Sequence, residues 1–165
     1  MRDLDSITLK TGTSSVTNAC GLDEARVEGY TGQLAELYPK YDLLVVSSGS
    51  IALGETIWKE LMPSMDYPGE QPLATLGSAG IFSVWQRGLE RHGIPAGQLL
   101  VSHREIDDSK EGPMLKKVLQ DSLQAGIVMI ANENDAVSDI EIKKKSYGGD
   151  NDGFCLLYTS PSPRD

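Results

Sequence analysis

Two short clusters of carboxylate and carboxamide side chains are the part of this sequence best suited to chemistry. The first is Asn132-Glu133-Asn134-Asp135 and the second is Gly149-Asp150-Asn151-Asp152. A carboxamide can donate to a carboxylate, and a carboxylate can accept from an ammonium group, so both clusters suit a small zwitterion. Asx turns are the alternative use of the same residues. From the local sequence alone, the two interpretations are about equal.

The first cluster follows a continuous apolar run at residues 127–131. Such a run is typical of a strand that is covered on both faces of a parallel sheet. Open α/β sheets bind ligands beyond the carboxyl ends of their strands, where this cluster is expected to lie.

A second candidate is the small-residue turn Lys10-Thr11-Gly12-Thr13-Ser14, which follows a β-branched run at residues 6–9. Gly12 would let backbone amides approach a phosphate closely, and Lys10 would add a mobile positive charge. The turn lacks the spacing of a GxxxxGK[ST] loop. A solvated lysine at the end of a strand is the structural alternative.

The turn Ser47-Ser48-Gly49-Ser50 joins the apolar run 43–46 to an expected helix beginning near Ile51. Free N–H groups at the start of that helix would favour an anion. Capping of the helix by Ser47 or Ser48 is an equally good interpretation. A nucleophile elbow is not indicated, because the GxSxG pattern is absent.

The expected elements alternate between strand and helix along the chain. The first expected helix begins at Asp23, which can act as its cap, and ends before Pro39. Three more helices are expected: one that begins near residue 51, one from 72 to 91, and one from Pro113 to 125. The last of these should turn four apolar side chains inward: Leu115, Val118, Leu119 and Leu123. Strands are expected at 6–9, 43–46, 99–101 and 127–131. This alternation predicts a parallel α/β sheet with helices on both faces.

Composition narrows the class of protein. A chain of 165 residues suits a single domain. Its net charge of −9 argues against a nucleic-acid-binding surface. The N-terminal residues lack the apolar core of a signal peptide, and no segment has the roughly 20 apolar residues of a membrane span. A soluble cytoplasmic protein without membrane partners is expected.

The last ten residues, 156–165, differ from the rest of the chain. Pro161 and Pro163 prevent the helix that the preceding pattern would place there. The stretch resembles the non-native tail that appears when a translated assembly reads into adapter DNA. It is therefore left out of the expected domain, which spans residues 1–155.

Taken in order, these motifs resemble the glutamate 5-kinases of the amino acid kinase family. The matching stretches cover residues 6 to about 154, and they are 9–14, 45–54, 97–100, 132–137 and 149–152. The paired Asn-Glu-Asn-Asp and Gly-Asp-Asn-Asp clusters are specific to that branch. The turns around Gly12 and Gly49 are shared more widely.

The resemblance implies a three-layer αβα sandwich, with residues 1–155 as its N-terminal, substrate-binding lobe. It also implies transfer of the γ-phosphoryl group of ATP to the side-chain carboxylate of L-glutamate, the first step of proline biosynthesis. Because a carboxylate is already a nucleophile, catalysis would consist of positioning two anions and screening their repulsion. Mg²⁺ would arrive with the nucleotide, and no metal site made by the protein is expected.

The resemblance also assigns roles residue by residue. Lys10 would neutralise the transferring phosphoryl group, and Asp152 would orient lysines around the phosphates. Nucleotide phosphates would contact Lys10, Gly12 and Thr13. Glutamate would lie among Ser48, Gly49, Asn132, Asn134, Asp135, Asp150 and Asn151.

Three departures from the family pattern accompany these assignments. Thr11 stands where the family usually has an apolar residue, and Ser50 stands where it usually has Ala. The stretch Tyr147-Gly148-Gly149 is one glycine longer than usual. The family's nucleotide-binding half would follow this chain, so we expect a truncated kinase that has no useful turnover alone and whose parent is a homo-oligomer.

Two other functions remain open at this point. One is a non-catalytic module that binds an acidic amino acid. The other is a different kinase of the same family, acting on acetylglutamate, aspartate or a nucleotide.

Overall fold

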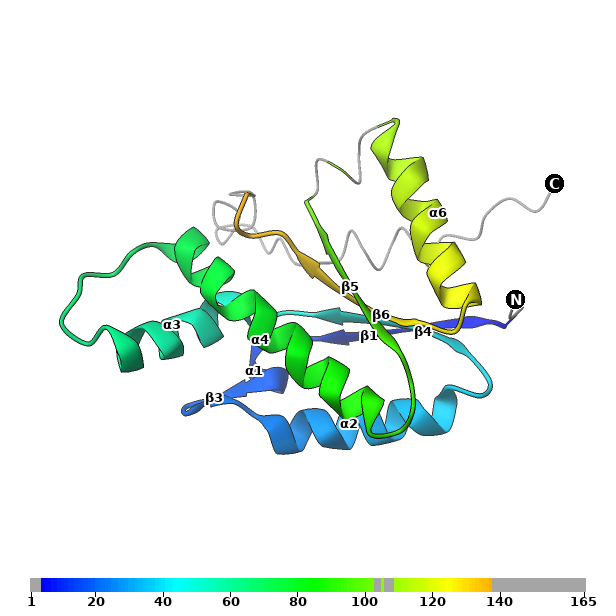
Figure 1. The fold of residues 1–165 in the computed structure, drawn as a ribbon, viewed down its shortest axis with the longest axis horizontal. Helices are drawn as coiled ribbons and strands as arrows, with labels where there is room; N and C mark the ends of the chain where they lie inside the picture. The colour runs from blue at the N-terminus through cyan, green and yellow to red at the C-terminus, as the bar shows by residue number, and fades with distance from the viewer. Residues whose placement is uncertain (1–3, 103–104, 106–108, 138–165) are drawn as a thin grey trace.

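A computed structural model describes residues 4–102, 105 and 109–137 (Figure 1). The second acidic cluster, with Asp150, Asn151 and Asp152, lies outside the described residues. So does the expected tail at 156–165. The fold below therefore concerns the part of the chain that holds Lys10, the serine-rich turn and the first acidic cluster.

Four parallel strands form the main sheet, in the order β1-β4-β6-β5. Their bounds are β1 Ser6–Thr11, β4 Asp42–Ser47, β5 Ala96–Val101 and β6 Val128–Glu133. The two inner strands, β4 and β6, are buried at every residue. This confirms the parallel sheet that the continuous apolar runs predict.

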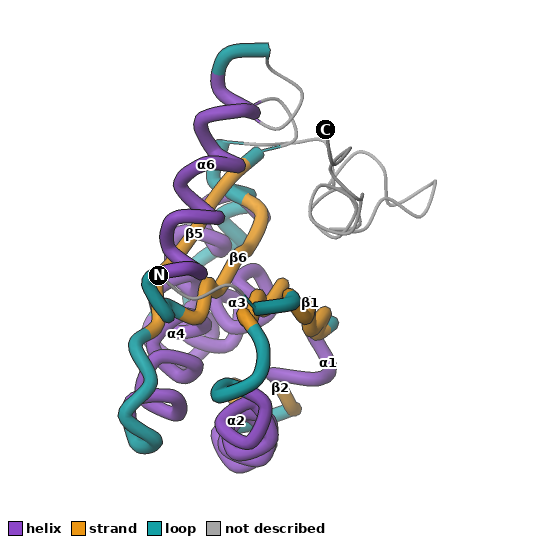
Figure 2. The backbone as a smooth tube through the Cα atoms, turned by 90° about the vertical axis from the view of Figure 1, so that its right-hand side faces the viewer, coloured by secondary structure: helices purple, strands orange, loops and turns teal. Residues whose placement is uncertain are grey.

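The side chains of β4 alternate between two separate hydrophobic clusters. Leu43 and Val45 belong to one cluster, and Leu44 and Val46 belong to the other. Because successive residues of a strand point to opposite faces, each cluster occupies one face of the sheet. Helices cover both faces, with α6 on the side opposite α2 and α4 (Figures 1 and 2). The described residues thus form three layers.

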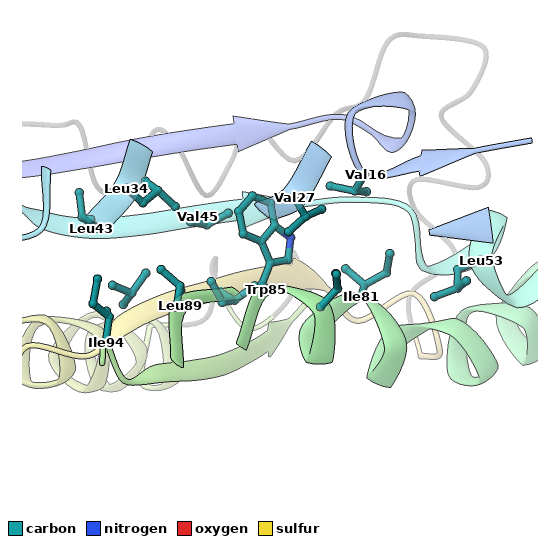
Figure 3. Packing of buried hydrophobic residues seen from close by; sticks show 13 residues of the cluster. Val16, Val27, Leu34, Leu43, Val45, Leu53, Ile81, Trp85, Leu89 and Ile94 are labelled. Atoms are coloured by element: carbon teal, nitrogen blue, oxygen red, sulfur yellow. The ribbon is translucent and has the colours of Figure 1, made fainter. Parts of the chain in front are cut away.

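The larger cluster lies between the sheet and the helices α2, Glu24–Leu37, and α4, Glu70–Glu90. Trp85 of α4 is fully buried at its centre, beside Val27 and Val45 (Figure 3). Its ring stacks on Tyr30 with the centroids 6.1 Å apart. Helix α2 begins as expected, since the side chain of Asp23 accepts from the Arg26 N–H at 3.1 Å.

The smaller cluster lies under α6, Glu111–Gln124. Leu119 and Leu123 are buried there and Leu115 packs against them, as expected. The expectation that Val118 points inward is wrong, because 46% of Val118 is exposed. Helical geometry explains the difference: Val118 lies about 100° from Leu119 around the helix axis, and only the stripe 115-119-123 faces the sheet.

Helices α3, Ser50–Leu61, and α4 pack against each other at backbone distance. A Cβ on Gly77 would lie 2.0 Å from the carbonyl oxygen of Ser50, and one on Gly54 would lie 1.9 Å from that of Leu73. Only glycine permits this approach. The contact fixes the start of α3 against the first turns of α4.

The structure corrects several expected boundaries. Strand β1 extends through Lys10 and Thr11, and β6 extends through Asn132 and Glu133, so these polar residues belong to strands and not to turns. A short helix α1, Thr13–Val16, and a hairpin of β2, Thr17–Asn18, with β3, Gly21–Leu22, were not expected. Within the described residues, no helix is both long and apolar enough to span a membrane.

Candidate functional site

The carboxyl ends of β1, β4 and β6 lie side by side at one edge of the sheet. Thr11 pairs with Ser47 across β1 and β4, and Val46 pairs with Ala131 across β4 and β6. The three motifs chosen from the sequence therefore meet where parallel α/β sheets hold their ligands. This edge is the candidate functional site.

The end of β1 presents exposed groups. Lys10, Gly12 and Thr13 are all exposed, and Lys10 pairs in register with Val46. A Cβ on Gly12 would meet nothing within 4 Å in the described part of the chain. The backbone there is open to a ligand, as the phosphate-binding interpretation requires.

The turn after β4 is held by Gly49 and not by a serine cap. Gly49 is the N-cap of α3 with φ 110°, a conformation that favours glycine. A Cβ there would also lie 3.1 Å from Cγ2 of Val16. Within the described residues no side chain caps α3, so capping by Ser47 or Ser48 is wrong. The first N–H groups of α3 therefore lack the side-chain oxygen that a serine cap would have offered.

The two serines of this turn have other contacts. Ser47 is fully buried, and its Oγ accepts from the indole Nε1–H of Trp85 at 3.1 Å. Ser48 is half-buried, and its Oγ lies 3.2 Å from Oγ1 of Thr13. Ser47 thus ties the turn to the core, whereas Ser48 ties it to the turn after β1.

Asn132 connects the end of β6 to the start of α3. Its Nδ2 donates to Oγ of Ser50 at 2.8 Å, and its Oδ1 accepts from the N–H of Glu133 at 2.9 Å. Both residues are buried. The carboxamide expected to contact substrate therefore has one hydrogen bond to the protein at each end.

A cavity of about 120 Å³ opens beside this bond. Asn134 and Asp135, two of the residues expected to contact substrate, line it. So do three hydroxyl residues from the two packed helices, Ser50, Thr75 and Ser78. The cavity therefore lies between the end of β6 and the close contact of α3 with α4.

Asp135 is the strongest chemical feature of the cavity. The residue is 8% exposed, and its buried Oδ1 has no hydrogen-bond partner among the described residues. Burial, with smaller contributions from the negative charges of Glu133 and Glu70, raises the pKa of its carboxyl group from 3.8 to about 6. An ammonium group in the cavity would supply both the missing donor and the missing positive charge.

Sequence reasoning missed the helical wall of this cavity. Thr75 and Ser78 lie on α4, which was expected only as a long helix, and Glu70 begins that helix. Ser50 was noted only as a departure from the family pattern. The one sequence feature that could have indicated this wall is the spacing of Thr75 and Ser78. They are three residues apart, which places both on the same face of the helix.

Together these features define the class of protein as a parallel α/β protein with a polar ligand site at its strand ends. Within the described residues no group of three His, Cys, Asp or Glu side chains could hold a metal ion. Asp150, Asn151 and Asp152 lie outside the described residues, so their expected place in the site stays a prediction.

The chain belongs to the amino acid kinase family, whose sequence profile matches residues 6–157. A glutamate 5-kinase from Acinetobacter baumannii is 33% identical over 153 residues, which cover 92% of this chain and 40% of that protein. A glutamate 5-kinase from Myxococcus xanthus is 34% identical over 160 residues, which cover 95% of this chain and 41% of that protein.

The chain thus spans about two fifths of the length of the curated relatives it matches. Among solved structures, an aspartate kinase from Synechocystis has a TM-score of 0.47 and 16% sequence identity to it. That match covers 75% of this chain and 21% of the aspartate kinase chain.

Proposed function

We propose that this chain is the substrate-binding part of a glutamate 5-kinase, which transfers the γ-phosphoryl group of ATP to the side-chain carboxylate of L-glutamate. The reaction would be the first step of proline biosynthesis, carried out in the cytoplasm. The single observation that carries the proposal is the buried Asp135 carboxylate, which lines the cavity and has an oxygen without a described partner. Membership of the family and the similarity to glutamate 5-kinases support it.

The chemistry of the site agrees with an amino acid substrate. Asp135 suits a free α-ammonium group, which N-acetylglutamate lacks. Lys10 lies near the end of β1, and the uncapped start of α3 follows the neighbouring strand β4. Both favour negative charge. A substrate that is positive at one end and negative at the other would match this order of charges.

The open backbone at Gly12 and the positive charge of Lys10 support the binding of ATP together with Mg²⁺. We propose that Lys10, Gly12 and Thr13 contact the phosphates, and that Mg²⁺ is held by the nucleotide. The ion would screen the repulsion between the phosphates and the attacking carboxylate. Lys10 would add to that screening from the end of β1.

Ligand binding by the whole 165-residue chain tests the proposal. Isothermal titration calorimetry should detect L-glutamate, with clearly weaker binding of N-acetyl-L-glutamate and L-aspartate. Asp135→Asn should weaken L-glutamate binding at least about 100-fold, because a buried charge pair is lost. Asp121→Asn is the matched control, since Asp121 forms an exposed ion pair with Lys117. Tighter binding of N-acetyl-L-glutamate than of L-glutamate would contradict the proposal.

Phosphoryl transfer needs a separate assay, on a protein that contains this chain and has the full length of its glutamate 5-kinase relatives. An acyl phosphate reacts with hydroxylamine, so glutamyl 5-phosphate can be trapped as a hydroxamate. We expect hydroxamate only when ATP, Mg²⁺ and L-glutamate are all present, and little of it from a Lys10→Met variant. Hydroxamate formation that does not depend on L-glutamate would reject this substrate.

A further inference from the structure

We infer that Ser50 is a further ligand-contacting residue, whose hydroxyl group donates a hydrogen bond to a carboxylate oxygen of the amino acid bound beside Asp135. The inference rests on the proposed function, because it concerns the same cavity. It goes beyond that function because the resemblance to the family assigns no ligand contact to Ser50.

The hydrogen bonds of Asn132 determine what Ser50 can do. Oδ1 of Asn132 accepts from the Glu133 N–H, which places the Nδ2 group toward Ser50. An amide nitrogen can only donate, so the Ser50 oxygen must be the acceptor in that 2.8 Å bond. The hydroxyl proton of Ser50 is then left to point elsewhere.

The cavity is the place where that proton can be used. Ser50 is 3% exposed and lines the cavity together with Asp135. No acceptor for its hydroxyl proton is found in the described part of the chain. A buried hydroxyl without an acceptor costs free energy, and a ligand oxygen in the cavity would remove that cost.

The other two hydroxyl groups of the cavity wall already donate hydrogen bonds to backbone carbonyls. Thr75 Oγ1 donates to the carbonyl of Pro72 at 2.6 Å, and Ser78 Oγ donates to that of Thr75 at 3.4 Å. Both bonds stay within α4. Ser50 is therefore the one hydroxyl of the cavity wall whose proton has no described acceptor.

Ser50 and Asp135 together present one donor and one acceptor to the same cavity. A carboxylate oxygen can accept from Ser50, and an ammonium group can donate to Asp135. An amino acid carries both groups, so the pair selects a zwitterion. A dicarboxylate without an amino group would leave Asp135 unpaired.

Binding of L-glutamate to Ser50→Ala tests the inference. We expect the dissociation constant to rise about tenfold, the usual cost of losing a hydrogen bond to a charged group. Ser78→Ala is the matched control, because its hydroxyl lines the same cavity with its proton bonded inside α4, and it should change the constant less than twofold. An equal loss in both variants, or a Ser50→Ala change below twofold, would overturn the inference.

Two further variants separate hydrogen bonding from packing and from Asn132. Ser50→Cys keeps the shape but has a weak donor, so it should lose affinity several-fold, and wild-type affinity would contradict the inference. In an Asn132→Ala background, Ser50→Ala should still weaken binding about tenfold. If it adds less than twofold, Ser50 acts only through Asn132 and the inference is wrong.

L-glutamate binding by the unsubstituted chain distinguishes failure of the inference from failure of the proposed function. L-glutamate binding that is equal in wild type and Ser50→Ala overturns the inference and leaves the proposed function standing. Absence of L-glutamate binding to the unsubstituted chain rejects the proposed function, and the role of Ser50 falls with it.

Discussion

The end of β6 and the end of β1 lie at the same edge of the sheet but are built differently. Asn132 and Asp135, at and just after the end of β6, are 7% and 8% exposed, and Asn132 is bonded to a residue 82 positions away. Lys10, Gly12 and Thr13, at the end of β1, are exposed. The groups proposed to contact the amino acid are therefore held by the fold, whereas the groups proposed to contact phosphate remain open to solvent.

The difference follows from what covers each end. The first turns of α4 and the start of α3 close over the end of β6 and leave a cavity of about 120 Å³. Over the end of β1, a Cβ on Gly12 would meet nothing within 4 Å in the described part of the chain. Buried polar groups need hydrogen-bond partners, which Asn132 finds in the protein and which a ligand would supply to Asp135. The exposed groups at the end of β1 can bond to water instead.

The largest expected effect comes from the helix contact that closes the β6 end. Gly77→Ala should lower the free energy of unfolding by about 3 kcal/mol, the upper end of the usual cost of overpacking, because its Cβ would clash with backbone atoms of α3. Gly12→Ala, the control at the open end, should change it by less than about 0.5 kcal/mol. Urea unfolding measures both, and equal losses would show that the two ends are similarly constrained.

The ionised carboxylate of Asp135 should lower the stability of the covered end. The pKa of Asp135 is raised from 3.8 to about 6 in the folded protein, so the folded state binds the proton more tightly than the unfolded state. The resulting stability is fully present below pH 3.8 and is lost as the pH rises through 6. The shift corresponds to about 3 kcal/mol at most.

Asp135→Asn should therefore be more stable than the wild type at pH 7.5 by up to about 3 kcal/mol, and the two should converge near pH 4. Urea unfolding across this range measures the difference, with Asp121→Asn as the control that removes an exposed carboxylate. A difference that stays constant from pH 4 to pH 8 would mean that the Asp135 carboxyl group titrates normally.

Ser47 provides a smaller test of how the core holds the site. Ser47→Ala leaves the buried indole N–H of Trp85 without its acceptor and should cost about 1–2 kcal/mol in urea unfolding. Ser83→Ala is the control, because the Ser83 hydroxyl accepts from Arg87 in an exposed bond on the same helix. Equal losses of stability in the two variants would contradict the expectation that the buried bond from Trp85 to Ser47 is the stronger of the two.

The sequence predicted correctly those features that depend on the residue pattern of a single strand or helix. The apolar runs at 43–46 and 127–131 predicted the two central strands, and Asp23 predicted the start of α2. The order of strands and helices then brought the three polar motifs to one edge. Each of these features depends on residues close together in the chain, which is why pattern alone could find them.

The parts that the sequence could not provide depend on contacts between distant elements. Asn132 bonds to Ser50, 82 positions away, and the helical wall of the cavity comes from α3 and α4, which approach closely at Gly54 and Gly77. Val118 was wrongly predicted to be buried, because its residue type does not distinguish an apolar residue beside the buried stripe of a helix from one within it. Ser47 matched a helix cap by type, yet its hydroxyl accepts from Trp85, 38 positions away.

The smallest expected effect is at the hydroxyl pair that joins the two open turns. Oγ of Ser48 and Oγ1 of Thr13 lie 3.2 Å apart in an exposed position, where water can replace either partner. Thr13→Ala, Ser48→Ala and the double variant should therefore give a coupling free energy below about 0.5 kcal/mol in urea unfolding. A coupling above 1 kcal/mol would show that the turn after β1 is fixed by the turn after β4 before any ligand binds. The end of β1, proposed to bind phosphate, would then be prepared by the fold as well, and its difference from the end of β6 would be one of exposure alone.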